Sequence, residues 1–191
     1  CKPFDEERNG LTLGEGAGYI MIESEQTVRQ EDKTPICQIK GYGNACDAFH
    51  QTALSQEGDG AFISMQKAVE KAGITPGMID YINAHGTGTR NNDLSEGKAI
   101  RRIFQGSIPP FSSTKSFTGH TLGAAGAIEA IFCILALKHQ MIYPNLNFKR
   151  EMTDLGFSPV TTFQSNIRLR NIMSNSFGFG GNNTSLIFSG C

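Results

Sequence analysis

Short apolar runs alternate with stretches of helical periodicity along this chain. The run AGYIMI, which follows a glycine-rich turn, is typical of a buried strand. Five further short runs have the same strand-like character. The predicted strands are therefore 17–22, 35–43, 81–84, 111–113, 172–175 and 184–188.

Three longer stretches have the spacing of helices. In 59–72 the apolar residues Phe62, Met65 and Val69 recur at near-helical intervals, and Gly73 is a natural stop for the helix. The other long helices are predicted over 93–104 and 123–140, and a short helix followed by a loop over 23–33.

Strands that alternate with helices predict an α/β fold, with a mostly parallel or mixed sheet covered by helices. The chain shows no internal repeat and no linker-like stretch, so we expect one domain over residues 1–191. In such sheets the loops after the carboxyl ends of strands carry the chemistry. The segments 83–85 and 113–115 both occupy that position, whereas 145–165 is the least regular region.

Charge and cysteine content narrow the possible functions. With 17 basic and 18 acidic residues, we expect neither nucleic acid nor a membrane as partner. The longest apolar run, 124–137, contains Glu129 and is too short to span a bilayer. The five cysteines form no C-x-x-C pair, which argues against a zinc site or disulfide framework and favours a cytoplasmic location. Because the chain lacks an initiator Met, we expect a fragment of a longer protein.

The segment 85–89 (HGTGT) is the first candidate for chemistry. A histidine at a strand end, followed by small residues, leaves its imidazole in an open site, and Gly86 and Gly88 allow a ligand to approach the backbone. Thr87 and Thr89 add hydroxyl groups. The segment lacks the glycine pattern of a phosphate loop. Taken alone, a histidine beside a glycine turn is equally compatible with a structural role.

The segment 115–126 (KSFTGHTLGAAG) places a second histidine, His120, near the start of a helix, where free N–H groups favour a neutral imidazole or a developing anion. Glu129 is the one ionisable residue of the apolar helix that follows. A buried carboxylate needs a cation or several donors, and Lys115 is the obvious candidate. Plain helix packing for His120 and a solvent-facing Glu129 are the alternatives.

The segment 175–183 (NSFGFGGNN) is a glycine-rich loop with two aromatic residues. Phe179 lies between glycines and is free to swing as a gate. A tight turn with aromatic residues in the core is the alternative reading of this loop taken alone.

Together these motifs resemble those of the β-ketoacyl-acyl-carrier-protein synthases, condensing enzymes of the thiolase-like fold. The resemblance covers essentially the whole chain, in family order, and corresponds to the C-terminal half of such an enzyme. The combination of NAHGTGT with KSFTGHTLGAAG is highly specific. The matching segments are 1–5 (CKPFD), 13–18 (LGEGAG), 47–50 (DAFH), 83–89, 115–126 and 175–183.

The resemblance implies a role for each matching residue. His85 and His120 match the histidines that bind the thioester carbonyl as negative charge develops on it. Lys115 matches the lysine that supports this pair, and Glu129 its carboxylate partner. The residues that match the substrate pocket are Thr87 and Thr89, which hydrogen-bond the pantetheine arm, Thr52, a third pocket hydroxyl, and Phe179, the gating aromatic.

The resemblance also implies the reaction and the partners. A cysteine takes an acyl group from a phosphopantetheine thioester, malonyl-carrier protein loses CO₂, and the resulting carbanion attacks the acyl-cysteine to give a 3-ketoacyl thioester. We expect no metal and no separate cofactor, because the substrates are carried on the phosphopantetheine of acyl carrier protein. A second ketosynthase subunit, identical or different, is the other expected partner.

The nucleophilic cysteine belongs to the N-terminal half of the family, and none of the five cysteines here occupies its motif. We interpret Cys46 as structural and Cys133 as a small buried hydrophobic residue. The chain by itself is therefore not expected to catalyse condensation.

Two alternatives stay open. Some relatives replace the nucleophile and act as a partner subunit, similar to a chain-length factor, that shapes the acyl pocket of an active synthase. Intact His85, Lys115 and His120 argue against that role. The other alternative is a decarboxylase that uses only the two histidines. The residue at the nucleophile position distinguishes them, since Cys supports the synthase and Gln or Ala supports an alternative.

Overall fold

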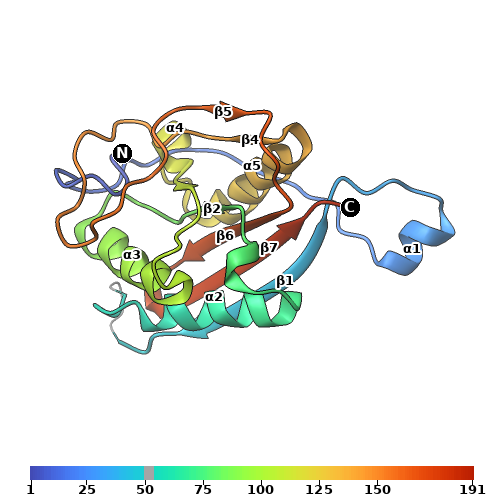
Figure 1. Ribbon diagram of the computed structural model, residues 1–191, viewed down its shortest axis with the longest axis horizontal. Helices are drawn as coiled ribbons and strands as arrows, with labels where there is room; N and C mark the ends of the chain where they lie inside the picture. Colours follow the sequence, from blue (N-terminus) through green and yellow to red (C-terminus); the bar gives the residue numbers. More distant parts are fainter. Residues whose placement is uncertain (50–53) are drawn as a thin grey trace.

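The computed structural model describes residues 1–49 and 54–191, and a five-stranded mixed sheet lies at its centre (Figure 1). The strand order is β1-β7-β6-β2-β3. β2 is parallel to both β6 and β3, whereas β7 is antiparallel to both β6 and β1. The strands are β1 (Gln38–Cys46), β2 (Tyr81–Asn83), β3 (Phe111–Ser112), β6 (Asn171–Phe177) and β7 (Asn182–Ser189).

Helices cover both faces of this sheet, as the alternating pattern predicts. α2 (Asp59–Ala72) and α3 (Arg90–Phe104) pack on one face, and α5 (Ala125–His139) on the other (Figure 1). The remaining elements are short. They are α1 (Glu25–Gln30), α4 (Lys115–Thr118), the 3-10 turns Pro76–Met78, Leu122–Ala124 and Phe179–Gly181, and the small sheet of β4 (Met141–Ile142) with β5 (Gln164–Ser165).

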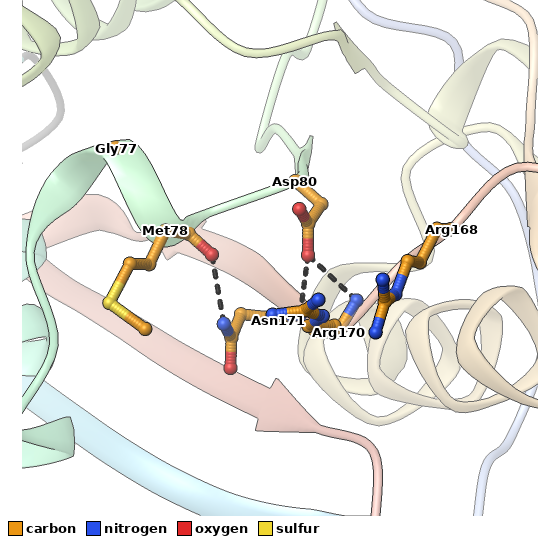
Figure 2. Close-up of a pocket in the computed structure, with 6 residues that line it drawn as sticks. All are labelled: Gly77, Met78, Asp80, Arg168, Arg170 and Asn171. Carbon is orange, nitrogen blue, oxygen red and sulfur yellow. Dashed lines mark hydrogen bonds between the residues drawn. The ribbon is translucent and has the colours of Figure 1, made fainter.

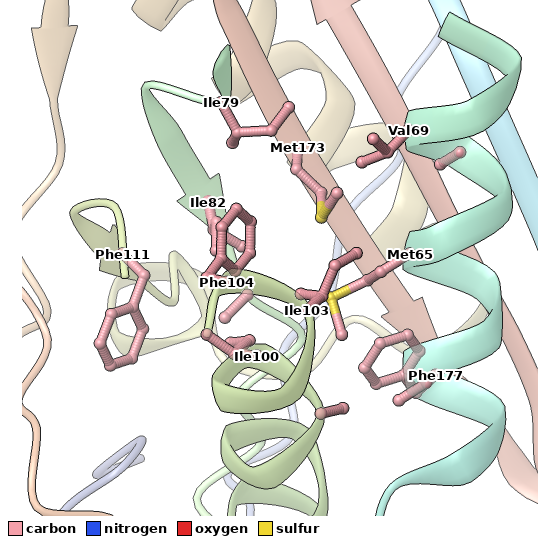
Figure 3. Packing of buried hydrophobic residues seen from close by; sticks show 14 of the residues in the cluster. Met65, Val69, Ile79, Ile82, Ile100, Ile103, Phe104, Phe111, Met173 and Phe177 are labelled. Carbon is pink, nitrogen blue, oxygen red and sulfur yellow. The ribbon is translucent and has the colours of Figure 1, made fainter. Parts of the chain in front are cut away.

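The core divides into two clusters because successive strand residues point to opposite faces of the sheet. In the larger cluster, Met65 of α2 and Ile103 of α3 meet Phe177 of β6 (Figure 3). The smaller cluster lies beneath α5. The strand residues of the first cluster include Ile82, Met173 and Ile187, and those of the second include Tyr81, Ile172 and Phe188.

The predicted helix 59–72 matches α2, and its packing on β1 depends on two glycines. A Cβ atom added to Gly43 would lie 2.0 Å from the Ser64 carbonyl oxygen, and one added to Gly41 would lie 2.2 Å from that of Ala68. Gly73 ends the helix in the left-handed conformation, with φ of 65°. The close approach of strand to helix thus requires residues without side chains.

The predicted buried strand 17–22 is wrong. This segment is extended but pairs with no described strand, and it leaves Tyr19, Met21 and Ile22 with exposed fractions of 91%, 84% and 71%. An apolar run signals a surface that requires burial, but a strand forms only where a neighbouring strand completes its hydrogen bonds. The segment instead passes over α5, where a Cβ on Gly18 would lie 3.2 Å from Ala127.

The segment Leu122–His139 is long and apolar enough to cross a membrane by length and composition, although 33% of it is buried within this chain. One side of α5 packs on β6 and carries the buried Glu129. The core helix of a soluble protein passes the same test of length and composition, so the finding is weak evidence for a membrane span.

Candidate functional site

The predicted site residues converge at one end of the sheet. His85 follows β2, Lys115 follows β3, and β2 pairs in parallel with both β3 and β6. The carboxyl ends of these strands therefore lie side by side. The structure brings His85, Lys115, His120 and Glu129 into one cluster, although the first and the last are 44 positions apart in the sequence.

Lys115 lies at the centre of this cluster and is fully buried. Its Nζ atom lies 3.1 Å from Nδ1 of His85 and donates to the His85 carbonyl oxygen at 2.7 Å. A third bond goes to Oε1 of Glu129. An ammonium group has three donors and no acceptor, so all three donors are satisfied and Nδ1 of His85 must accept. The ring proton of neutral His85 is thereby assigned to Nε2.

His120 is half-buried and faces His85, with ring centroids 5.4 Å apart and an interplanar angle of 86°. The backbone N–H of Leu122 donates to Nδ1 of His120 at 3.2 Å. This bond assigns the ring proton of His120 to Nε2 as well. Each histidine therefore has one nitrogen fixed by the protein and one N–H left to donate.

Electrostatics keeps both imidazoles neutral. Burial lowers the pKa of His85 well below its ordinary value, and the Lys115 charge, together with the repulsion from His120 whenever that ring is protonated, lowers it further. Burial and Lys115 also lower the pKa of His120. A neutral imidazole donates a hydrogen bond without carrying a charge of its own. Two such donors suit an oxygen on which negative charge develops during a reaction.

Glu129 is buried and pairs with Lys115, so it does not face solvent. Burial raises the pKa of its carboxyl group, although the Lys115 charge opposes that rise. Its Oε2 atom has no hydrogen-bond partner among the described residues. Lys115 makes the largest contribution that opposes the rise, and the Ser176 hydroxyl adds a smaller one, so the carboxylate is stabilised inside the protein mainly by Lys115.

Two buried carboxylates of α3 hold the loop that follows His85, and sequence reasoning missed both. Glu96 accepts the backbone N–H groups of His85 at 2.9 Å and Gly86 at 2.8 Å. Asp93 accepts that of Gly88 at 3.1 Å. Burial raises the pKa of Glu96 to about 7. Their spacing of three residues puts both on one helix face, a signal present in the sequence.

The other predicted pocket residues lie around the histidines. The hydroxyl groups of Thr87 and Thr89 are 2.8 Å apart. Phe179 follows β6 in the glycine loop and is 73% exposed. Thr52 lies outside the described residues, so its predicted place in the pocket stays a prediction.

A pocket of about 690 Å³ opens between these groups. Its walls come from the two histidine loops, the start of α5 and the glycine loop. None of the five cysteines is among the described residues that line it. Within residues 1–49 and 54–191, no three His, Cys, Asp or Glu side chains gather as a metal site requires. Its lining includes His85, Thr87, Thr89, His120, Phe177 and Phe179.

A smaller pocket of about 250 Å³ includes Asp80 and Asn171, which flank the opposite, amino ends of β2 and β6 (Figure 2). The carboxylate of Asp80 accepts the backbone N–H groups of Arg170 at 2.7 Å and Asn171 at 2.9 Å. It therefore stabilises the start of β6. None of the predicted site residues lines this pocket.

Comparison with known proteins places the chain in a family. Residues 36–149 match the family described as "Beta-ketoacyl synthase, C-terminal domain". The mitochondrial 3-oxoacyl-[acyl-carrier-protein] synthase of Arabidopsis thaliana is 43% identical over 98% of this chain and 42% of its own length. 3-Oxoacyl-[acyl-carrier-protein] synthase 2 of Staphylococcus aureus is 42% identical over 98% of this chain and 47% of its own length.

Solved structures of ketosynthases are also similar to this chain. A ketosynthase complex, solved as a type II PKS acyl-carrier protein with its ketosynthase bound to the hexaketide, superposes with a TM-score of 0.94 at 30% identity. The match covers 99% of this chain and 47% of that one. The chain thus spans about half the length of the relatives it matches. It belongs to the β-ketoacyl synthase family, whose C-terminal domain it contains.

Proposed function

We propose that this chain is the C-terminal part of a 3-oxoacyl-[acyl-carrier-protein] synthase. The reaction is the decarboxylative condensation of malonyl-carrier protein with an acyl-enzyme, in fatty-acid or polyketide biosynthesis. One observation carries the proposal: Nδ1 of each histidine is occupied by a donor, which leaves two neutral Nε2–H groups in one pocket.

These two N–H groups suit the decarboxylation step. Loss of CO₂ from a malonyl thioester leaves an electron pair that the thioester carbonyl takes up as an enolate oxygen. A positioned donor that bonds such an oxygen contributes roughly 3 kcal/mol of transition-state stabilisation. Lys115 orients the His85 ring and Glu129 pairs with Lys115. Both are buried beneath His85 and therefore do not contact the enolate in this proposal.

Formation of the carbon–carbon bond requires a cysteine thiol that carries the acyl group. The described part of this chain places no such thiol in the pocket. No cysteine lines the described pocket, and the Cys133 thiol is buried with its pKa raised to about 12 by burial. We propose that the nucleophilic cysteine lies in a segment of the polypeptide outside these 191 residues. The isolated chain is then expected to yield no 3-ketoacyl product from acyl- and malonyl-carrier protein.

Substrate binding follows from the same pocket. We propose that Thr87 and Thr89, with Thr52, hydrogen-bond the pantetheine arm and that Phe179 gates the entrance. The reaction calls for no resident metal or cofactor, since both acyl groups arrive on acyl carrier protein. A second ketosynthase subunit and a cytoplasmic location belong to the same proposal, and the five unpaired cysteines support that location.

The test uses the full-length protein encoded by the gene and measures two products separately. These are CO₂ released from malonyl-carrier protein and the 3-ketoacyl thioester. We expect His85→Ala and His120→Ala each to lower CO₂ release at least about 100-fold, the usual effect of removing an oxyanion donor. His139→Ala, an exposed histidine at the end of α5, is the matched control. Near-normal CO₂ release in both site variants would contradict the proposal.

The same assay addresses the alternatives. A protein that releases CO₂ but forms no 3-ketoacyl thioester, and that carries Gln or Ala at the nucleophile position, is a decarboxylase or partner subunit instead. The buried Lys115 with all its donors satisfied favours the synthase, because a subunit that only shapes a pocket has no use for an oriented imidazole pair.

A further inference from the structure

The segment 4–14, which precedes every catalytic motif in the sequence, touches both histidine loops in turn. We call this segment the brace. The backbone N–H of Phe4 donates to Oδ2 of Asp93 at 2.7 Å, and Asp93 also holds the N–H of Gly88. The Phe4 ring is buried directly under the first loop, since a Cβ on Gly86 would lie 2.8 Å from it.

Arg8 continues the contact with the first loop and is only 7% exposed. Its Nε donates to the Thr89 carbonyl oxygen at 3.2 Å and its Nη2 to that of Arg90 at 2.8 Å. A third bond, from Nη1, ties it to the Asp5 carbonyl oxygen within the brace at 3.0 Å. A planar guanidinium can serve three carbonyls at once, and a lysine cannot do so in the same geometry.

The brace then crosses to the second loop. The N–H of Gly10 donates to the Gly88 carbonyl oxygen at 3.0 Å. Two residues later, the N–H of His120 donates to the Thr12 carbonyl oxygen at 2.7 Å, and the N–H of Gly14 donates to the His120 carbonyl oxygen at 3.1 Å. Both backbone polar groups of His120 are therefore bonded to the brace.

The approach at Gly14 leaves no room for a side chain. A Cβ atom there would lie 2.0 Å from the Thr118 carbonyl oxygen, a rigid backbone atom in the turn that leads to His120. At Gly16 a Cβ would instead lie 2.9 Å from the terminal methyl group of Ile128, which can move aside. A methyl group at Gly14 would thus displace backbone, whereas one at Gly16, just beyond the brace, would displace only the end of a side chain.

We propose that the brace sets the position of His120 relative to His85, with Arg8 and Gly14 as positioning residues. The inference rests on the proposed function, because it concerns the same two histidines. Neither residue contacts the substrate in this scheme. Each acts by fixing the loop that carries a histidine, so that both Nε2–H groups meet one oxygen atom.

The experiment compares Gly14→Ala with Gly16→Ala in the full-length protein encoded by the gene. The measurements are thermal stability, kcat and KM for CO₂ release from malonyl-carrier protein, and the ring ¹H–¹⁵N signals of the two histidines. We expect Gly14→Ala to shift the His120 ring signals and to lower kcat about 100-fold, as a displacement of roughly 1 Å does, with KM nearly unchanged. Gly16→Ala should leave both kcat and the His120 ring signals as they are in the wild type.

Arg8 variants supply a second test if Gly14→Ala does not fold. Arg8→Ala frees the Thr89 and Arg90 carbonyls, so kcat should fall and the His85 ring signals should shift, and Arg8→Lys should recover part of both. Wild-type ring signals and kcat in destabilised but folded variants would overturn the inference. If the wild type releases no CO₂, the proposed function fails, whereas the ring signals still decide whether the brace positions the histidines.

Discussion

Lys115 is the residue on which the local electrostatics depends most. Its ammonium group satisfies a buried carboxylate and fixes the tautomer of a buried imidazole at the same time. Sequence reasoning found His85, His120, Lys115 and Glu129, because each stands in a motif or is an isolated charge in an apolar helix. It missed Asp93 and Glu96, because carboxylates within a polar helix pattern look like ordinary solvent-facing residues.

Replacing Lys115 by Met leaves Glu129 buried without a cation. We expect the free energy of unfolding to fall by about 3–5 kcal/mol, the usual cost of removing one partner of a buried ion pair. The double variant Lys115→Met/Glu129→Leu should recover most of that loss in urea denaturation, because the unpaired charge is gone. It should not recover CO₂ release, because Nδ1 of His85 still lacks its donor. Recovery of both would mean that Lys115 serves stability alone.

Glu96 should make stability depend on pH. Its pKa in the folded protein, about 7, lies above the ordinary value of 4.5, so the folded state holds a proton that the unfolded state releases first. The stabilising contribution is therefore complete below pH 4.5 and is lost as pH rises towards 7.

Glu96→Gln removes this titration. Measured by urea denaturation between pH 5 and 8, the difference in unfolding free energy between variant and wild type should move in favour of the variant as pH rises. A constant difference for Glu96→Gln would show that its pKa is not raised.

At the scale of elements, the apolar pattern predicts the type and the bounds of a helix or strand well where the surface that it packs against lies within the chain. The predicted helix 59–72 coincides with α2 because its apolar face meets β1, β6 and β7. The predicted strand 35–43 begins earlier than β1, and β1 continues to Cys46, where its pairing with β7 ends. The strand 17–22 fails because its apolar side chains have no described partner strand.

The contact between β1 and α2 can be tested with one methyl group. Gly43→Ala places a Cβ atom 2.0 Å from the Ser64 carbonyl oxygen, so the helix or the strand must shift. We expect a loss of about 1–3 kcal/mol in the free energy of unfolding, which is typical of overpacking. Gly77→Ala is the matched control, because nothing lies within 4 Å of its added Cβ. Equal stabilities of the two variants would contradict the close packing seen here.

At the scale of the molecule, this chain leaves apolar surface in the open. Tyr19, Met21 and Ile22 project from an extended segment that passes over α5, and α5 itself exposes Leu135. Large apolar side chains that are this exposed on one short segment are typical of a surface that another protein surface covers. The chain spans about half the length of the curated relatives that it matches.

We expect the isolated 191-residue chain to self-associate. Size-exclusion chromatography should show large species, and a dye that binds apolar surface should fluoresce strongly. The triple variant Tyr19→Ser/Met21→Ser/Ile22→Ser should elute closer to a monomer, whereas Leu11→Ser, a single exposed site near the histidine pocket, should change elution little. A monomeric wild-type chain that binds no dye would contradict this expectation.

The sequence by itself determined the long helices and the strands of the central sheet, the placing of His85 and Lys115 after strands, and the family. These features are local, because periodicity and motif spacing depend only on residues that are close together in the sequence. Only the tertiary structure decided that Glu96 and Asp93 hold the His85 loop, that segment 4–14 reaches both histidines, and that 17–22 stays unpaired. Each of these depends on hydrogen bonds or packing between distant parts of the chain, which the topology of the sheet creates and local pattern does not encode.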